Sequence, residues 1–460
     1  MLTYELKKMP GLPLYESLYR CIRQDILTGQ LTPGQKLPSK RALATNLEVS
    51  KITVEGAYDQ LLSEGYIRSV EKVGYFVEDL TQFQTPDTGF AKLDFFPQQE
   101  KTSGETLIDL TGNEPAKFPF SVWSRLQREV MLDLGESLLA PLSNCGLWEL
   151  RQAIASHLYQ FRRMRIDPGN ILVGAGTDFL YNLLVQLLGR EQIYAVEDPG
   201  YGKTGRIYRS AGAGCVCAPL DDQGVMPQCL GDAGVLHISP SHHYPTGIVM
   251  PLQRRQALLS WAYGKEDRWI IEDDYDSEFR FHARPIAAMQ TMAPDRVIYL
   301  NTFSKSLAPS IRISYMVLPP QLMARFHREL GFYSCTVPSF EQYTLARFLQ
   351  GGHFEKHINR MRKFYKSRRN RILAAVGSCP VQDKLTILEQ NAGLHFLVRV
   401  ETDLSDPELT ELCRQRGLLV RTLGSYYHNG APGDTHTLVV NYSGLSDRDV
   451  ATLEQILKEL

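Results

Sequence analysis

A lysine in a loop of small hydroxylated residues is the first feature of this sequence that could carry chemistry. The stretch TFSKSLAPSIR covers residues 302 to 312 and places Lys305 seven positions before Arg312. An amine that forms a Schiff base with a cofactor aldehyde needs hydrogen-bond donors nearby to hold the phosphate of that cofactor. The same stretch also suits an ordinary strand-loop-strand connection with solvated cations, so both interpretations stay open on these residues.

Pyridoxal 5′-phosphate (PLP) is a cofactor with such an aldehyde, and it makes further demands on the chain. Its pyridine nitrogen needs a carboxylate partner to stay protonated. In WIIEDDYDSEF an apolar strand ends at Glu272 and Asp273. This places an acid at the carboxyl end of a strand, where ligands bind in open α/β sheets. Tyr275 follows closely and could hydrogen-bond the phenolic oxygen O3′ of the ring.

Donors for a phosphate and a flat surface for the ring occur in other segments. ILVGAGTDFLYNLL has the pattern of strand, glycine turn and helix, so the backbone N–H groups of Gly176 and Thr177 would lie at a helix N-terminus suited to an anion. Tyr201, in VEDPGYGK, could stack on the ring. The lysine loop itself supplies further donors: Thr302, Ser304 and Arg312. Ordinary alternatives stay open: Asp273 could be a helix cap, Gly176 a turn and Tyr201 a packing aromatic.

The elements that would hold these residues alternate along the chain. From residue 108 onward, the apolar strand candidates NILVGAG, QIYAVEDPG, GVLHISP, RWIIEDDYD and RVIYLNTFSK alternate with helical patterns such as LWELRQAIASHLYQFR. This alternation predicts an α/β domain with a largely parallel sheet. The stretch from about residue 80 to 106 is polar, contains Pro and Gly and has no sustained period, as expected of an interdomain linker.

Residues 13 to 77 form a separate unit with helical periodicity and a strand-like end. SKRALATNL predicts a short helix, and KITVEGAYDQLLSEG predicts a second one after a turn of about three residues, which indicates helix-turn-helix geometry. The hairpin pattern GYIRSVEKVGYFV would follow as a wing. Polar side chains at the starts of both helices and in the wing are candidates for DNA contacts: Ser39, Lys40, Arg41, Ser50, Lys51, Thr53 and Lys72. Because this unit is only mildly basic, a small helical oligomerisation module is the alternative.

The composition limits the remaining classes. A chain of 460 residues, 43% apolar and 22% charged, suits a globular protein of two or more domains. The formal net charge of -1 means that DNA would have to be met by a local patch. Of the eight cysteines only Cys215 and Cys217 lie close together, which is too few for a tetrahedral zinc site, so no metal is expected. Neither a signal-peptide pattern nor a bilayer-length apolar run occurs, which predicts a cytoplasmic protein without membrane contact.

The amino-terminal motifs resemble those of a known family. The run from Leu37 to Ala44, the pattern A-Y-x-x-L-x-x-E-G-Y from Ala57 to Tyr66, and Gly74 at the wing tip are similar to the winged helix-turn-helix of GntR transcription regulators. The resemblance implies that this part of the chain binds promoter DNA.

The remainder of the chain, residues 108–460, resembles the fold-type I aminotransferases of the aspartate aminotransferase type, in which the same features occur in this order with the lysine last. The resemblance implies a mostly parallel sheet and a small α+β carboxy-terminal subdomain. It also implies that Lys305 forms a Schiff base with PLP, that Asp273 pairs with the pyridine nitrogen, that Tyr275 contacts O3′ and that Tyr201 stacks on the ring. The phosphate ligands would be Gly176, Thr177, Thr302, Ser304 and Arg312.

A GntR head on residues 1–79, a linker on residues 80–107 and an aminotransferase-like body on residues 108–460 is the arrangement of the MocR/GabR subfamily of regulators. The resemblance implies a homodimeric transcription regulator. In that subfamily the body binds PLP and a small-molecule effector, mediates dimerisation and usually does not turn over substrate.

Two positions depart from a working aminotransferase. Tyr244 stands where an asparagine usually contacts O3′, and Val439 aligns where an arginine usually clamps a substrate carboxylate. Lys203 and Arg421 are candidates to replace that arginine. Otherwise the effector lacks a carboxylate, and PLP, another vitamin B6 compound or an amino compound is expected. An active aminotransferase with a DNA-binding head is the alternative, because the main cofactor groups are kept, and a B6 carrier without DNA binding is a third interpretation.

Overall fold

The structure is a computed structural model, and it describes residues 4, 13–79, 107–112, 117–281, 287–388 and 393–458. The chain divides into two compact units, Met1–Ser103 and Gly104–Leu460, which we call the head and the body. The greater part of the predicted linker, residues 80–106, lies outside the described residues.

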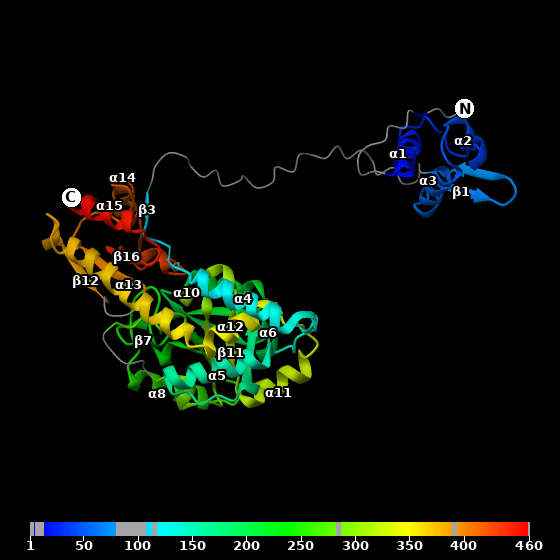
Figure 1. Cartoon of the computed structure of the whole chain (residues 1–460). Coiled ribbons are helices and arrows are strands. Elements are labelled where there is room, and N and C mark those ends of the chain that lie inside the picture. Colours follow the sequence, from blue (N-terminus) through cyan, green and yellow to red (C-terminus); the bar gives the residue numbers. More distant parts are fainter. Residues whose placement is uncertain are drawn as a thin grey trace. The chain divides into compact units, whose positions relative to one another are not determined.

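The described residues of the head form three helices and a hairpin, coloured blue in Figure 1. They are α1 (Leu14–Leu27), α2 (Lys40–Asn46), α3 (Lys51–Ser63), β1 (Ile67–Val70) and β2 (Gly74–Val77). The helices pack around a core of fully buried side chains, among them Leu18 and Ile22 of α1, Leu43 of α2, and Val54 and Leu61 of α3. The predicted winged helix-turn-helix is confirmed.

Side-chain caps set where the second and third helices of the head begin. Ser39 accepts a hydrogen bond from Ala42 N at 3.2 Å, and Ser50 accepts one from Thr53 N at 3.1 Å. Such caps satisfy backbone N–H groups that have no partner within the helix. The wing turns at Lys72, whose φ of 59° lies in the left-handed region, so that Val70 pairs with Gly74.

The body is built on an eight-stranded sheet (Figure 1). In sheet order its strands are β4 (Ile171–Gly174), β11 (Ser314–Val317), β10 (Val297–Thr302), β9 (Trp269–Asp273), β8 (Val235–Ile238), β5 (Ile193–Asp198), β6 (Gly214–Asp221) and β7 (Gly224–Val225). The strands from β10 to β6 are parallel to their neighbours, while β11 and β7 are antiparallel. The predicted mostly parallel α/β sheet is confirmed, and β4, β5, β8, β9 and β10 coincide with the five predicted strands.

Both faces of this sheet are covered, which explains why its central strands are apolar without alternation. On β10, Ile298 and Leu300 lie in one hydrophobic core and Tyr299 lies in another. The first core is completed by α6 (Thr177–Leu188), α7 (Gly202–Ser210) and α11 (Pro320–Glu329). The second is completed by α4 (Phe120–Leu134), α5 (Trp148–Arg162), α12 (Ser339–Gln350) and α13 (His353–Val376). A third core contains Leu258 of α8 (Leu252–Tyr263) together with Ile270 of β9 and Val297 of β10. Two short helices are α9 (Met289–Met292) and α10 (Phe303–Ser306).

The carboxy-terminal subdomain, orange to red in Figure 1, has its own antiparallel sheet. Its strands, in sheet order, are β12 (Leu385–Leu388), β13 (His395–Val400), β16 (Thr437–Asn441) and β15 (Arg421–Thr422). Two further helices belong to it, α14 (Asp406–Gln415) and α15 (Asp447–Lys458). The segment that follows the linker joins this subdomain, because β3 (Ile108–Asp109) pairs in parallel with β14 (Leu418–Leu419). Within the described residues, none of the helices combines the length and the apolar character needed to cross a membrane.

Candidate functional site

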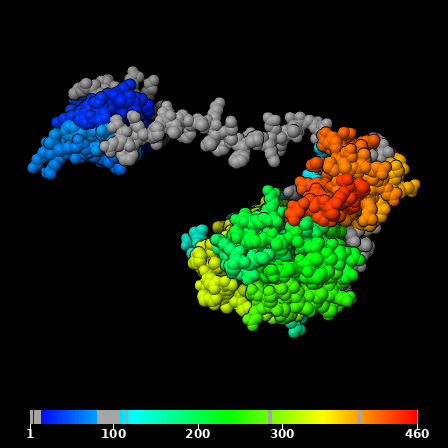
Figure 2. All heavy atoms as spheres, turned by 180° about the vertical axis from the view of Figure 1, so that it is seen from behind, coloured from blue at the N-terminus to red at the C-terminus, as the bar shows by residue number. Residues whose placement is uncertain are grey.

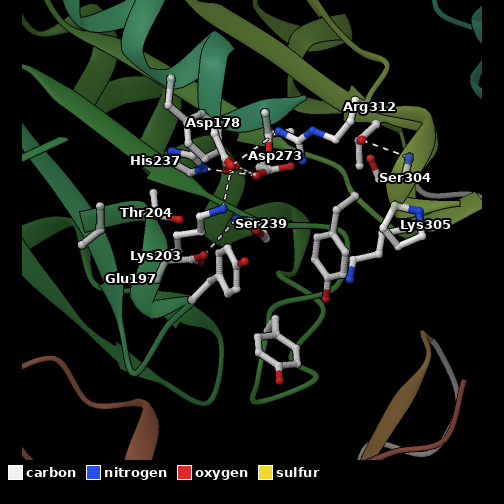
Figure 3. A pocket seen from close by; sticks show the side chains of 18 of the residues that line it. Asp178, Glu197, Lys203, Thr204, His237, Ser239, Asp273, Ser304, Lys305 and Arg312 are labelled. Carbon is white, nitrogen blue, oxygen red and sulfur yellow. Dashed lines mark hydrogen bonds and ion pairs between the residues drawn. The ribbon is translucent and has the colours of Figure 1, made fainter. Parts of the chain in front are cut away.

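A pocket of about 410 Å³ lies at the carboxyl ends of the parallel strands of the body (Figure 3). Asp273 ends β9, Thr302 ends β10, and Ser239 directly follows β8. All three line the pocket, which is the position expected for a ligand in an open α/β sheet. Eight of the nine predicted cofactor residues line it together: Thr177, Tyr201, Asp273, Tyr275, Thr302, Ser304, Lys305 and Arg312. The ninth, Gly176, is the N-cap of α6.

Asp273 is held by two neighbours on one of its oxygens. Tyr181 of α6 donates a hydrogen bond to Oδ2, and His237 Nε2 of β8 lies 3.4 Å from the same oxygen. Tyr208 in turn lies 2.6 Å from His237 Nδ1. The other oxygen, Oδ1, is buried and has no hydrogen-bond partner among the described residues. A buried carboxylate oxygen without a partner is costly, so Oδ1 is suited to a cationic donor on a ligand.

Tyr181, His237 and Tyr208 were not predicted from the sequence as site residues. Burial and the charge of Asp273 raise the pKa of Tyr181 well above its ordinary value, so this phenol keeps the proton that it donates. His237 stands in the buried strand segment VLHI. A polar residue in such an apolar strand is the one signal in the sequence that could have pointed to it.

Lys305 lies on the short helix α10, directly after β10 (Figure 3). Phe303 and Ser306 on either side of it are buried, which fixes the helix against the body. Thr302 Oγ1 caps α10, since it accepts hydrogen bonds from Ser304 N at 3.1 Å and from Ser314 Oγ at 2.8 Å. These contacts place the half-buried lysine in the wall of the pocket.

The N-terminus of α6 forms a cradle with Arg312. Gly176 has φ of 90°, and a Cβ atom at this position would come within 2.3 Å of Arg312 Nη2. Arg312 also has a positive φ, of 50°, and donates to the carbonyl of Ala175 at 3.2 Å. The backbone N–H groups that begin α6 and this guanidinium therefore converge on one small space, as an anion site requires.

Asp178 stands beside this cradle and binds two cations. Lys203 Nζ lies 2.6 Å from Asp178 Oδ2, and Arg312 Nη2 lies 3.5 Å from the same oxygen (Figure 3). The predicted effector residue Lys203 lines the pocket, and its ammonium group is paired with Asp178.

Tyrosines are prominent in the lining of the pocket, among them Tyr201, Tyr244 and Tyr275. The rings of Tyr201 and Tyr244 are 6.3 Å apart, and the Tyr244 hydroxyl lies 2.9 Å from the hydroxyl of Tyr426. Tyr275 lies 3.3 Å, through its hydroxyl, from His242 Nδ1. Where aminotransferases are expected to place an asparagine, this chain thus has a phenol that is already paired with a second phenol.

Glu197 is a second acid in the pocket that the sequence did not reveal. Burial, assisted by the nearby charge of Asp273, raises the pKa of Glu197 to about 8, although a hydrogen bond from Ser239 N opposes the shift. The side chain is therefore mainly protonated at neutral pH. In this state it adds no negative charge beside Asp273.

Val439, where an arginine was expected in an aminotransferase, is fully buried. On β16 it lies opposite Leu397 and Arg421 of the neighbouring strands. Arg421 is exposed and does not line the pocket. Of the two effector candidates, the structure therefore brings Lys203 to the pocket and leaves Arg421 outside its lining.

In the head, some of the predicted DNA-binding residues are engaged within the fold and others are exposed. The hydroxyl of Thr53 is among those engaged, since it lies 2.8 Å from the hydroxyl of Ser50. Lys40 is mostly buried, and its ammonium group lies 3.2 Å from Glu55 Oε1 and 3.1 Å from Asp59 Oδ1, so it links α2 to α3. These carboxylates raise the pKa of Lys40 although burial opposes them. Ser39 and Ser50 are helix caps. The exposed cations of the predicted set are Arg41, Lys51 and Lys72.

Both units of the chain are similar to known proteins. Residues 14–77 match the gntR family of bacterial regulatory proteins. Nearly the whole chain is similar to two regulators. It is 31% identical to the probable rhizopine catabolism regulatory protein MocR of Rhizobium meliloti, over 96% of this chain and 92% of that protein. It is 32% identical to the pyridoxine biosynthesis regulator PdxR of Corynebacterium glutamicum, over 95% of this chain and 93% of that protein. The chain belongs to the MocR/GabR-type subfamily of GntR transcription regulators.

The body of this MocR/GabR-type regulator has the aminotransferase fold. It is similar to the crystal structure of the kynurenine aminotransferase of Pyrococcus horikoshii in complex with PMP, with a TM-score of 0.65 and 26% identity. The match covers 77% of this chain and 91% of that structure. The predicted aspartate aminotransferase-like fold is thereby confirmed, and this neighbour holds PMP in its crystal structure.

The residues of the pocket fit PLP. The unpartnered Oδ1 of Asp273 suits a protonated pyridine nitrogen, and the cradle at Gly176 admits no larger side chain and is lined by donors suited to a phosphate. Lys305 supplies an amine in the same pocket. No single feature decides the fit; the combination of an acid, an anion cradle and a lysine does.

Proposed function

We propose that this protein is a PLP-binding transcription regulator whose head binds promoter DNA and whose body senses a vitamin B6 compound or an amino compound. The observation that carries the proposal is the conjunction, in one chain with a GntR head, of Lys305, the unpartnered oxygen of Asp273 and the cradle at Gly176. The division into a head of residues 1–79, a linker of residues 80–107 and a body of residues 108–460 is part of this proposal. A regulator that reads promoter DNA acts in the cytoplasm.

Each residue of the pocket has a distinct part in this function. PLP, when bound, supplies an electrophilic aldehyde carbon and an electron-withdrawing ring. Lys305 provides the amine that holds the aldehyde, and Asp273 keeps the ring nitrogen protonated while Tyr181 and His237 fix the orientation of its carboxylate. Tyr201 and Tyr275 contact the ring and its O3′.

The phosphate is held by a second group of residues. The donors are the backbone N–H group of Thr177, the hydroxyls of Thr302 and Ser304, and the guanidinium of Arg312. The N–H group of Gly176, which the sequence predicted as a donor, is engaged by the carbonyl of Gly174 at 2.8 Å. Asp178 holds Arg312 and Lys203 at the edge of this group and weakens the positive potential there. The phosphate therefore relies chiefly on the helix N-terminus and on Arg312.

The effector is proposed to lack a carboxylate that must be clamped. Val439 offers no charge, and Lys203 is already paired with Asp178. PLP itself satisfies this condition, and the relative PdxR is a regulator of pyridoxine biosynthesis. An amino compound without a carboxylate is the other effector of the proposed class.

A homodimer is proposed from an apolar surface of the body. Leu132 of α4, Leu139 just after it and Phe332 before α12 are each more than three-quarters exposed. These elements lie together, because Ser339 at the start of α12 donates to the carbonyl of Leu138 at 2.7 Å. Large exposed apolar side chains in one region are typical of a protein interface, and a second copy would cover them. Sedimentation of the body should show twice the monomer mass.

Reconstitution with PLP tests the proposal. The loaded chain should absorb visible light, and borohydride followed by peptide mass spectrometry should find a pyridoxyl group on the peptide that contains Lys305. The Lys305→Ala variant should lose both signals and keep its fold. A chain that takes up no PLP contradicts the proposal.

An active aminotransferase is the second candidate, favoured by the complete set of cofactor groups around Asp273 and Lys305. Incubation with a panel of amino acids and keto acids separates the two candidates. Repeated turnover supports the enzyme, whereas a spectral change without turnover supports the regulator.

A further inference from the structure

A second cavity, of about 330 Å³, lies inside the carboxy-terminal subdomain. Its walls are apolar side chains of the sheet, such as Phe396, Val398 and Val440, and of the helices, such as Leu409 and Leu453. Protein interiors normally leave few voids larger than a water molecule. Small-molecule sites measure roughly 300–1,000 Å³ and are mostly apolar. The size and lining of this cavity are therefore those of a ligand site rather than of ordinary core packing.

The cavity is separate from the cofactor pocket. None of the residues that line it also lines the pocket that contains Lys305. Their lining residues are neighbours in sequence in the segment after the linker, where Leu110 lines the cavity and Thr111 and Gly112 line the cofactor pocket.

Charged side chains stand among the polar residues of the cavity wall. Lys384, directly before β12, and Arg416, directly after α14, are both exposed, and Glu401 is the one acid among the lining residues. Two cations and one carboxylate leave one net positive charge beside an apolar interior. That combination matches a ligand with an apolar body and a single negative charge, and it disfavours a polyanion such as a nucleotide.

We infer that this cavity binds an aliphatic monocarboxylate, with the chain in the apolar interior and the carboxylate at Arg416 and Lys384. The inference does not depend on PLP or on the proposed regulatory function.

The position of the cavity gives such a ligand a route to the rest of the protein. Leu418, which lines the cavity, belongs to β14 and pairs with Ile108 of β3. Ile108 N also donates to the carbonyl of Gly417, directly before β14, at 2.8 Å. Asn441 of β16 then donates to the carbonyl of Leu110 at 3.1 Å. A ligand in the cavity therefore contacts the segment by which the chain enters the body.

Octanoate is the probe for the first experiment, with the PLP-loaded full chain and titration calorimetry. We expect saturable binding of one octanoate per chain and no change of the visible absorbance. Cys413→Phe fills the cavity from α14 and should abolish binding, whereas Cys229→Phe, at an exposed cysteine outside the cavity, should leave it unchanged.

The charge of the ligand is tested with Arg416→Gln. This variant should bind octanoate about tenfold more weakly, which is the effect of losing one charge-assisted hydrogen bond. Its affinity for octanol, which carries no charge, should change far less. Arg414→Gln, on the same helix but outside the cavity wall, is the matched control and should bind octanoate as the unsubstituted chain does.

Protection of Cys413 in the unsubstituted chain gives a readout that needs no variant. Octanoate should slow alkylation of this thiol, followed by peptide mass spectrometry, and should not slow alkylation of Cys229. Three results overturn the inference: no saturable binding, equal affinity in a folded Cys413→Phe variant, or no protection of Cys413. The cavity would then be a packing space without a ligand.

Discussion

Replacing Asp273 by asparagine isolates the contribution of one charge to cofactor binding. The substitution keeps the size of a side chain that is only 9% exposed, and it keeps an acceptor for Tyr181. It removes the negative charge from Oδ1, the oxygen that has no hydrogen-bond partner among the described residues. A hydrogen bond to a charged group contributes about 1.5–3 kcal/mol, so the dissociation constant for PLP should rise roughly 10- to 150-fold.

The assay is a PLP titration of the stripped Asp273→Asn chain, followed by absorbance at constant pH and salt. Asp222→Asn, at an exposed aspartate in the turn between β6 and β7, is the matched control and should bind PLP normally. Thermal unfolding of both variants without PLP checks that the body is intact. If the folded Asp273→Asn variant binds PLP as tightly as the unsubstituted chain, the assignment of Oδ1 to the ring nitrogen is refuted.

Three further changes test other parts of the account. If the exposed guanidinium of Arg41 contacts a phosphate, Arg41→Ala should weaken the binding of specific and of nonspecific DNA alike. The slope of log affinity against log salt should also fall by about one unit. Arg20 pairs with Glu16 on α1, and Arg20→Ala should change neither quantity. Gly176→Ala should lower the affinity for PLP, because the new Cβ would meet Arg312 Nη2 at 2.3 Å. Inorganic phosphate should then also bind the pocket more weakly, and an unchanged phosphate affinity would contradict the assignment of the phosphate site to Gly176 and Arg312. The pKa of Glu197 is about 8 in the folded state, against an ordinary value of 4.5. Between these values the folded state holds a proton that the unfolded state releases. The free energy of unfolding without PLP should therefore fall as the pH rises from about 5 to 8. Denaturant titrations of Glu197→Gln should show a smaller fall over that range, and an equal fall shows that this carboxyl is not the cause.

Much of the fold could be predicted because local signals were strong. The glycine turn before α6, the acid at the end of β9 and the lysine after β10 each follow an apolar strand, and the parallel sheet brings the ends of those strands to one edge. The head could be predicted because Ser39 and Ser50 are explicit helix caps that leave a short turn between α2 and α3.

The parts that were missed depend on contacts between distant segments. Tyr181 and Asp273 are 92 positions apart, and His237 reaches the same carboxylate from a third segment, so no spacing rule connects them. The role of Lys40 likewise depends on burial against α3, which a basic residue at a helix start does not reveal. The pKa of Glu197 follows from burial that only the folded body creates.

We propose that ligand binding in the pocket of the body controls DNA binding by the head. The most direct test is the affinity of the full chain for a promoter fragment next to its own gene, measured by fluorescence anisotropy with and without PLP. We predict that PLP changes this affinity by roughly 5- to 150-fold, the usual range of coupling between two sites, and that the Lys305→Ala chain still binds the fragment without responding to PLP. Equal affinity of the stripped and the PLP-loaded chain, with PLP bound as the spectrum reports, would contradict the account.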